Sequence, residues 1–278
     1  MLGGTVIAVT VLLVWSLLAF ALEIPSGTRE ILFSDGKHRP LSLLQDLDGD
    51  GIFETRTVFK AGKAWRRLTD KDQDGKPEEE VILDPKGAPQ ELILDRNRDG
   101  KPDKWQFYRG GSPYLIREDN NFDGRPDLEA RLKGKKVLLL RRDEDGDGCF
   151  EYEEQSLEGG LKRVSIKKFT SVKKCEGRIW LQTYYRGKLP LKRLGDEDLD
   201  GHFEVEELFK DGRRCLVLKK SPQGKTEAFW YKGSSLAEGF LDQNGDGLLE
   251  RKYDYTRKKW FSLPQPLTLG KLRKRCGP

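Results

Sequence analysis

The chain has 278 residues, with 51 Lys and Arg against 46 Asp and Glu, and a formal net charge of +5 at pH 7. Its only histidines are His38 and His202, so no Ser/His/Asp or Cys/His catalytic arrangement can be assembled, and zinc-binding sequence clusters are absent. We therefore expect the protein not to be an enzyme, with a carboxylate-based hydrolase as the least favoured alternative.

An apolar run opens the chain. Residues 6–18 precede Ala19-Phe20-Ala21, a small-x-small sequence of the kind that a signal peptidase cleaves. We predict a signal peptide over residues 1–21, a mature chain from Leu22, and a secreted or periplasmic location. No Lys or Arg precedes the run, so the alternative is an uncleaved membrane anchor over residues 6–22. Only that alternative predicts attachment to a membrane.

The region 22–262 contains a nine-residue phrase seven times. An acid stands at position one, Asp or Asn at three, Asp at five, Gly at six, and Asp or Glu at nine. The first five copies start 24, 25, 24 and 24 residues apart, and the last two follow after 53 and 46 residues. The candidate metal ligands are Asp46, Asp48, Asp50, Glu54, Asp70, Asp72, Asp74, Glu78, Asp95, Asn97, Asp99, Asp103, Asp119, Asn121, Asp123, Asp127, Asp143, Asp145, Asp147, Glu151, Asp196, Asp198, Asp200, Glu204, Asp242, Asn244, Asp246 and Glu250.

This spacing suits a hard divalent cation. Calcium takes six to eight oxygens at about 2.3–2.6 Å, and alternate residues of a bent loop can supply them, helped by the backbone carbonyl of position seven. Without a cation, the carboxylates of one loop would repel each other. The sequence therefore predicts up to seven Ca²⁺ sites, with Mg²⁺ or Mn²⁺ as the second choice.

The phrase resembles the first half of an EF-hand loop, and the loops of thrombospondin type 3 repeats and integrin-like FG-GAP propellers. The resemblance implies a bacterial secreted calcium-loop repeat protein. An EF-hand also needs flanking helices and a Glu at position twelve. That position reads Thr57, Val81, Gln106, Ala130, Glu154, Glu207 and Tyr253. Five of the seven loops fail this requirement, so helix pairs are disfavoured, and the Phe-Gly element of FG-GAP repeats does not recur.

The segments between the loops have the pattern of β-hairpins. Trp105 and Phe107 alternate with Lys104 and Gln106, and glycines such as Gly62 stand where short turns are expected. We predict an all-β fold of tandem antiparallel hairpins of about 24 residues, joined by calcium loops in an open twisted meander or superhelix. A β-propeller of about five blades is the alternative, because the two doubled gaps are the length of a four-stranded blade.

Four cysteines, an even number in an exported chain, make two disulfides plausible in any of three pairings. Cys149 to Cys175 is preferred because about one repeat separates them. Cys215 and Cys276 are the other two. Residues 263–278 are predicted to be a basic C-terminal tail.

Divalent metal is the first expected partner. Seven bound ions would raise the formal charge from +5 to +19, and such a surface would attract an anionic glycan, lipopolysaccharide or envelope protein. No specific nucleic acid is expected. Aromatic groups that include Trp105, Trp180 and Trp230 suggest either cross-strand pairs or stacking platforms.

The sequence thus predicts an exported calcium-binding β-repeat protein whose ions rigidify the repeats, as an envelope or extracellular interaction or scaffold protein. An FG-GAP-like propeller that serves as an adhesin or glycan-binding protein is the alternative.

Overall fold

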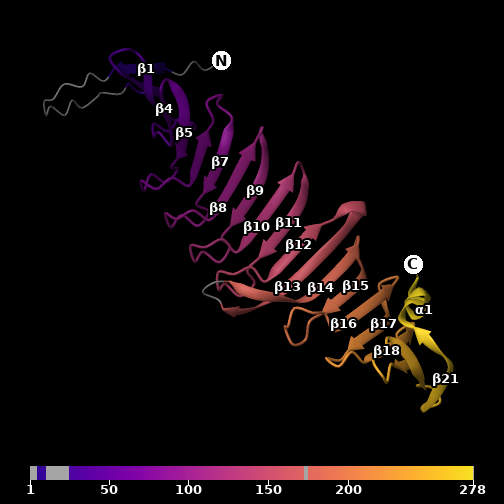
Figure 1. Ribbon diagram of the computed structural model, residues 1–278. Coiled ribbons are helices and arrows are strands. Elements are labelled where there is room, and N and C mark those ends of the chain that lie inside the picture. Colours follow the sequence, from indigo (N-terminus) through magenta and orange to yellow (C-terminus); the bar gives the residue numbers. More distant parts are fainter. Residues whose placement is uncertain (1–4, 11–24, 172–174, 278) are drawn as a thin grey trace. The chain divides into compact units, whose positions relative to one another are not determined.

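The structure, a computed structural model, describes residues 5–10, 25–171 and 175–277. The chain divides into two compact units, Met1–Lys136 and Val137–Pro278. Both consist almost entirely of β-strands (Figure 1). The predicted all-β class is confirmed.

The first unit contains ten strands among its described residues. They are β1 (Thr5–Thr10), β2 (Thr28–Ser34), β3 (Pro40–Gln45), β4 (Thr55–Lys60), β5 (Lys63–Thr69), β6 (Glu79–Leu83), β7 (Pro89–Leu94), β8 (Lys104–Arg109), β9 (Ser112–Glu118) and β10 (Leu128–Lys133).

The second unit contains the remaining strands and the short helices. These are β11 (Lys136–Arg142, whose first residue is the last of the first unit), β12 (Tyr152–Ser156), η1 (Glu158–Gly160), β13 (Leu161–Ser171), β14 (Glu176–Arg186), β15 (Leu189–Gly195), β16 (Val205–Lys210), β17 (Arg213–Lys220), β18 (Thr226–Lys232), β19 (Ser235–Leu241), β20 (Leu248–Asp254), β21 (Lys259–Thr268), α1 (Leu269–Arg273) and η3 (Lys274–Cys276).

Strands pair with their neighbours in the sequence. From β2 to β10 in the first unit, and from β11 to β21 in the second, each strand is antiparallel to the next. The β1 strand is parallel to β2. The ladder inside each unit is continuous and does not divide into four-stranded blades, so the open meander of hairpin repeats is confirmed and the propeller is not found.

Connections between the strands alternate between two edges of each unit. The nine-residue phrases lie at one edge, called here the loop edge, and shorter connections lie at the other, called the turn edge. At the turn edge, Ala61 and Gly62 have φ angles of 51° and 76°. Two successive positive φ angles define the tight type I′ hairpin turn, which favours glycine. Basic residues flank many of these turns, as Lys60 and Lys63 do here.

The two doubled gaps have a simple structural cause. At the loop edge of the second unit, β13 joins β14 and β17 joins β18 through connections that lack the metal phrase. In the second of these, the turn from Ser221 to Lys225 closes with a backbone hydrogen bond of 2.8 Å between Ser221 N–H and the Lys225 carbonyl. The hairpin period therefore continues without interruption where the acidic phrase is missing.

Few apolar side chains are fully buried in the first unit, and Ile31, Val81 and Ala130 are those among its described residues. Cross-strand ion pairs run along the sheet instead, with N–O distances of 2.5 to 3.1 Å. Examples are Arg66–Glu80, Lys104–Glu118 and Arg117–Glu129. Each partly exposed ion pair contributes only about 0.2–1 kcal/mol to the free energy of unfolding. This unit therefore depends on its backbone ladder and on many small cross-strand contributions.

Aromatic rings take part in the same cross-strand contacts. Phe107 on β8 lies 6.5 Å from Tyr114 on β9, measured between ring centroids. On the neighbouring hairpins of the second unit, Lys168 lies over the ring of Trp180 at 4.4 Å. The expected cross-strand role of the aromatic groups is confirmed at Phe107.

The second unit has a larger apolar core near its C-terminal end. Its buried members are Cys215, Leu216, Leu218, Ala228, Phe240, Leu249, Leu272 and Cys276. Within residues 263–278, predicted as a basic tail, residues 263–276 form the end of β21, α1 and η3, and they cover this core. The side chain of Leu272 in α1 is fully buried, and Arg273 and Arg275 form ion pairs with Glu206 and Glu238 at 2.5 and 2.7 Å.

Both disulfides lie in the second unit. Cys149 pairs with Cys175, as preferred from the repeat spacing, and Cys215 pairs with Cys276. The first disulfide joins two neighbouring connections of the loop edge, and the second ties η3 to β17.

Most of the predicted signal peptide or anchor falls on residues 1–4 and 11–24, which lie outside the described residues. Its described part, Thr5–Thr10, is the strand β1. No helix in the described part of the chain has the length and apolar character needed to cross a membrane.

Candidate metal centres

All seven acidic phrases fold into the same kind of loop. Four follow β3, β5, β7 and β9 in the first unit, and three follow β11, β15 and β19 in the second. The antiparallel meander returns the chain to the same edge after every hairpin, which is why each loop in a unit lies at that unit's loop edge. Regular hairpin length in the sequence therefore sets the placement of the loops.

Two backbone positions in every loop are left-handed. Position six is always glycine, with φ between 85° and 98°. Position four is glycine in three loops, but Gln73, Arg98, Phe122 and Leu199 occupy it in the others with φ of 58° to 61°. A non-glycine residue held in this region costs about 1–3 kcal/mol. The loop side chains must therefore supply contacts that hold the backbone in this conformation.

Those contacts come from the acidic side chains themselves. In all seven loops the Asp at position one accepts a hydrogen bond from the N–H of the position-six glycine, at 2.7–3.1 Å. Position three accepts from the N–H of position five at 3.0–3.3 Å. Position five accepts from the N–H of position seven at 2.7–2.8 Å. In five loops, both oxygens of position one accept backbone N–H groups. The acidic side chains thus shape the loop, and their oxygens without a backbone donor remain for a ligand.

Five loops bring their carboxylates together. In each, one oxygen per residue lies within 4.8 Å of the corresponding oxygens of the others. The groups are Asp46, Asp48, Asp50 and Glu54; Asp70, Asp72 and Asp74; Asp143, Asp145, Asp147 and Glu151; Asp196, Asp198, Asp200 and Glu204; and Asp242, Asp246 and Glu250. These five acidic clusters could hold a metal ion.

The clusters also contain buried oxygens that have no hydrogen-bond partner among the described residues. Every one of the five loops has one such oxygen: Glu54 Oε1, Asp70 Oδ1, Glu151 Oε1, Asp196 Oδ1 and Glu250 Oε1. Asp196 is the clearest case, since only 1% of this residue is exposed. Burying an anionic oxygen without a partner is costly, and a cation removes that cost. The donor set therefore fits a hard divalent ion.

The pKa of Glu151 is consistent with a cluster that favours a cation. Burial raises the pKa of its carboxyl, backbone N–H donors partly oppose the rise, and the charges of Asp145 and Asp143 add to it. Neighbouring anions make each further ionised group less favourable in the metal-free loop.

Position nine separates the seven loops into two kinds. In the five clustered loops it is Glu, whose Oε2 accepts from the N–H of position two at 2.8–3.1 Å. In the loops that begin at Asp95 and Asp119 it is the shorter Asp103 or Asp127. Each of these has one oxygen that accepts from two successive backbone N–H groups, at 2.5 to 3.1 Å. Neither loop forms a cluster of three acids in the described chain.

We predict that Asp103→Glu adds one metal site. The longer side chain would reach position two with one oxygen and present the other to Asp95 and Asp99, as in the clustered loops. Calcium titration calorimetry should then give one more bound ion than the wild type. The matched change Glu204→Asp should remove one ion, and an unchanged stoichiometry in both variants would contradict the role given to position nine.

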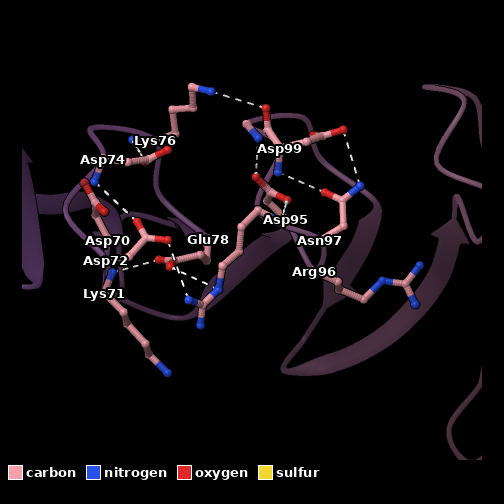
Figure 2. A network of polar contacts seen from close by, with 12 residues as sticks. Asp70, Lys71, Asp72, Asp74, Lys76, Glu78, Asp95, Arg96, Asn97 and Asp99 are labelled. Atoms are coloured by element: carbon pink, nitrogen blue, oxygen red, sulfur yellow. Dashed lines mark hydrogen bonds and ion pairs between the residues drawn. The ribbon is translucent and has the colours of Figure 1, made fainter.

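Arg98, at position four of its loop, forms ion pairs with the preceding loop. Figure 2 shows the acidic side chains of that loop, among them Asp72 and Glu78. Its guanidinium lies 3.6 Å from Asp72 Oδ2 and 3.6 Å from Glu78 Oε1. In return, Lys76 Nζ donates to the carbonyl of Asp99 at 3.3 Å. The guanidinium would therefore compete with a metal ion for Glu78, which is absent from the cluster of Asp70, Asp72 and Asp74.

Removing that competitor should strengthen the site. We expect Arg98→Gln to raise the calcium affinity of the loop at Asp70 by roughly threefold, because partly exposed ion pairs contribute up to about 1 kcal/mol. The NMR signal of the Gly75 amide, which donates to Asp70, reports on this loop alone. Arg96→Gln is the control, since Arg96 donates to the Asp119 carbonyl instead. Equal effects of the two changes would refute the competition.

Sequence reasoning treated the seven loops as equivalent, and it missed Arg98 as a competitor. The Asp or Glu choice at position nine was visible in the sequence, and its one-methylene difference was a usable signal. The structure brings together three or four of the predicted ligands in each of five loops, and Glu78 and Asn244 are not among the clustered residues. The sites at Asp95, Asn97, Asp99 and Asp103 and at Asp119, Asn121, Asp123 and Asp127 remain predictions.

The fold and the clusters define an all-β hairpin-repeat protein with acidic loops compatible with calcium-loop repeats. No family model matches the chain, and no curated protein matches it. Among solved structures, similarity is found to accessory secretory protein 1, 2 and 3 of Streptococcus pneumoniae, with 19% identity and a TM-score of 0.27 over 32% of this chain and 17% of that one.

Two further structures are similar over longer stretches. S. aureus TarM in complex with Fondaparinux, alpha-GlcNAc-glycerol and UDP gives 11% identity and a TM-score of 0.23 over 49% of this chain and 21% of that one. The TcdB2–TccC3 structure gives 13% identity and a TM-score of 0.21 over 81% of this chain and 16% of that one. This chain therefore spans about a fifth or less of the structures it matches, and similarity at this level carries no functional argument.

Proposed function

We propose that this protein is an exported calcium-binding β-repeat protein in which bound ions rigidify the loop edge of each unit. One observation carries the proposal: five loops place three or four carboxylates within 4.8 Å, and each of the five also has a buried oxygen without a partner. An ion in each cluster would give those oxygens a partner and relieve the repulsion among the acids.

Calcium is favoured over magnesium by the donors. All of them are oxygens, and each loop offers up to four side chains and the carbonyl of position seven, a number that suits the six to eight ligands of calcium. Magnesium demands near-ideal octahedral geometry, keeps several waters and is rarely enclosed by an all-protein set.

A structural role is favoured over catalysis. The first unit has few fully buried apolar side chains, and strained residues such as Gln73 and Phe122 stand inside its loops. Metal binding to the folded loop but not to the unfolded chain would stabilise this arrangement. We propose a scaffold or interaction protein of the cell envelope or extracellular space.

An oxidising compartment is supported by the two disulfides, Cys149–Cys175 and Cys215–Cys276. Extracellular modules usually bind calcium with dissociation constants of about 10⁻⁴ to 10⁻³ M, which suffices outside the cytosol. Export through the apolar segment at the N-terminus is part of this proposal.

The direct test is titration calorimetry of the protein with calcium. We expect five ions per chain, with magnesium binding more weakly. A variant with Gln in place of Glu at position nine of the five clustered loops is the control, because it keeps the size of the side chain and removes its charge. Absence of saturable calcium binding at millimolar concentrations would overturn the proposal.

A further inference from the structure

The turn edge of the second unit contains a basic hollow that the metal loops do not use. Its volume is about 410 Å³. Two turns, between β16 and β17 and between β18 and β19, line it together with the C-terminal segment. The lining residues that matter here are Lys210, Asp211, Arg213, Arg214, Lys232 and Arg275, and Trp230 and Tyr231 form part of its wall.

The charge of this hollow is strongly unbalanced. Five cations face one acid, Asp211. Arg214 and Arg275 have ion-pair partners, Glu207 at 2.9 Å and Glu238 at 2.7 Å. The other three cations, Lys210, Arg213 and Lys232, form no ion pair within the described residues. An anion that enters would therefore meet uncompensated positive charge.

Contacts within the protein also fix the arginine side chains of the hollow in the absence of a ligand. The guanidinium of Arg275 lies 5.4 Å from the ring centre of Trp230 and 5.5 Å from that of Phe240. The neighbouring Cys276 is bonded to Cys215. Arg214 lies 5.8 Å from the ring centre of Tyr231. A fixed guanidinium loses little freedom on binding, which favours recognition of a phosphate or sulfate group.

Two features indicate a sugar that bears such a group rather than a bare anion. Asp211 would repel an inorganic anion, but its carboxylate can accept hydrogen bonds from hydroxyls. Arginine already lies over Trp230 and Tyr231, so base stacking is disfavoured.

We propose that this hollow binds an anionic sugar, with the cations holding its sulfate or phosphate ester and Asp211 accepting from its hydroxyls. The site lies at the edge opposite the metal loops and does not rest on their occupancy. If no anionic sugar binds in this hollow, the calcium stoichiometry is still expected to be as proposed above. The two proposals are therefore tested separately.

The test is calorimetric titration of the protein with glucose 6-sulfate, glucose 6-phosphate, glucose and inorganic sulfate. We expect both esters to bind, and glucose and inorganic sulfate to bind at least tenfold more weakly. Binding of one ester alone would identify the source of the anion. Equal binding of inorganic sulfate, or no saturable binding of either ester, would overturn the proposal.

Variants locate the site. The double change Arg213→Gln and Lys232→Gln breaks no ion pair and should weaken ester binding roughly tenfold or more, given the usual strength of hydrogen bonds to charged groups. Arg186→Gln with Lys188→Gln removes the same charges from another turn of this edge and should leave binding unchanged. Equal losses in both would show non-specific attraction and refute the site.

A second variant separates the sugar from its charged group. Asp211→Asn should weaken binding of the sulfate ester while that of inorganic sulfate stays the same or rises, because a repelling charge is lost. Weaker binding of both ligands would contradict the role of Asp211. The calcium stoichiometry of every variant confirms that the fold is intact.

Discussion

Chelation of calcium with EDTA is expected to lower the midpoint of thermal unfolding by roughly 10 °C or more. Sites with a dissociation constant of about 10⁻⁴ M, held at a hundredfold excess of calcium, contribute about 2.7 kcal/mol each. One kcal/mol shifts the midpoint of a domain of this size by about 2–8 °C. The first unit has two clusters and the second has three, so both units should lose stability.

Three measurements check this expectation. Differential scanning calorimetry with and without calcium gives the midpoint, far-UV circular dichroism reports the strands, and limited proteolysis should show new cleavage within the loops. The variant with Gln at position nine of the five clustered loops should lose most of its response to EDTA. If chelation leaves all three measurements unchanged, the ions have no structural role.

Removal of the Cys215–Cys276 disulfide should destabilise the second unit by about 4 kcal/mol, the loop-entropy value for a sequence separation of this length. The double change Cys215→Ala and Cys276→Ala avoids a free thiol. It also loosens the segment that contributes the buried Leu272 and the ion pairs of Arg273 and Arg275. Urea unfolding followed by Trp fluorescence measures the loss.

The other disulfide supplies the comparison. Cys149→Ala with Cys175→Ala opens a shorter loop, with a separation of 26 against 61 residues, and should cost slightly less. It should also weaken calcium binding at the loop of Asp143, because Cys149 stands at position seven there. Removal of the Cys215–Cys276 disulfide should leave calcium binding at this loop unchanged. Calcium binding that responds to both disulfides alike would contradict this assignment.

Local features were predictable from the sequence. The alternation at Trp105 and Phe107 predicted a strand, the recurring phrase predicted the loops, and the repeat length favoured Cys149–Cys175. All of these depend on residues close together in the chain or one hairpin apart. In a meander, neighbours in sequence are neighbours in space. The repeat period of the sequence therefore predicts most of the strand pairing.

Other features depend on contacts that no local pattern specifies. Arg98 reaches Asp72 across two loops, and Leu272 packs on strands far earlier in the chain. The basic hollow needs Lys210, Lys232 and Arg275 to converge from three segments. The difference between Asp103 and Glu204 at position nine was readable in principle, but its effect depends on which backbone N–H groups the side chain can reach.

The alternation of connections between two edges gives the second unit an electrical polarity. Carboxylates gather along one margin, and Lys210, Arg213 and Lys232 stand along the opposite one. A negatively charged surface should therefore meet the basic margin first. Scarce calcium would strengthen this preferred orientation and abundant calcium would weaken it, so the calcium concentration around the protein would tune how this unit faces a charged surface.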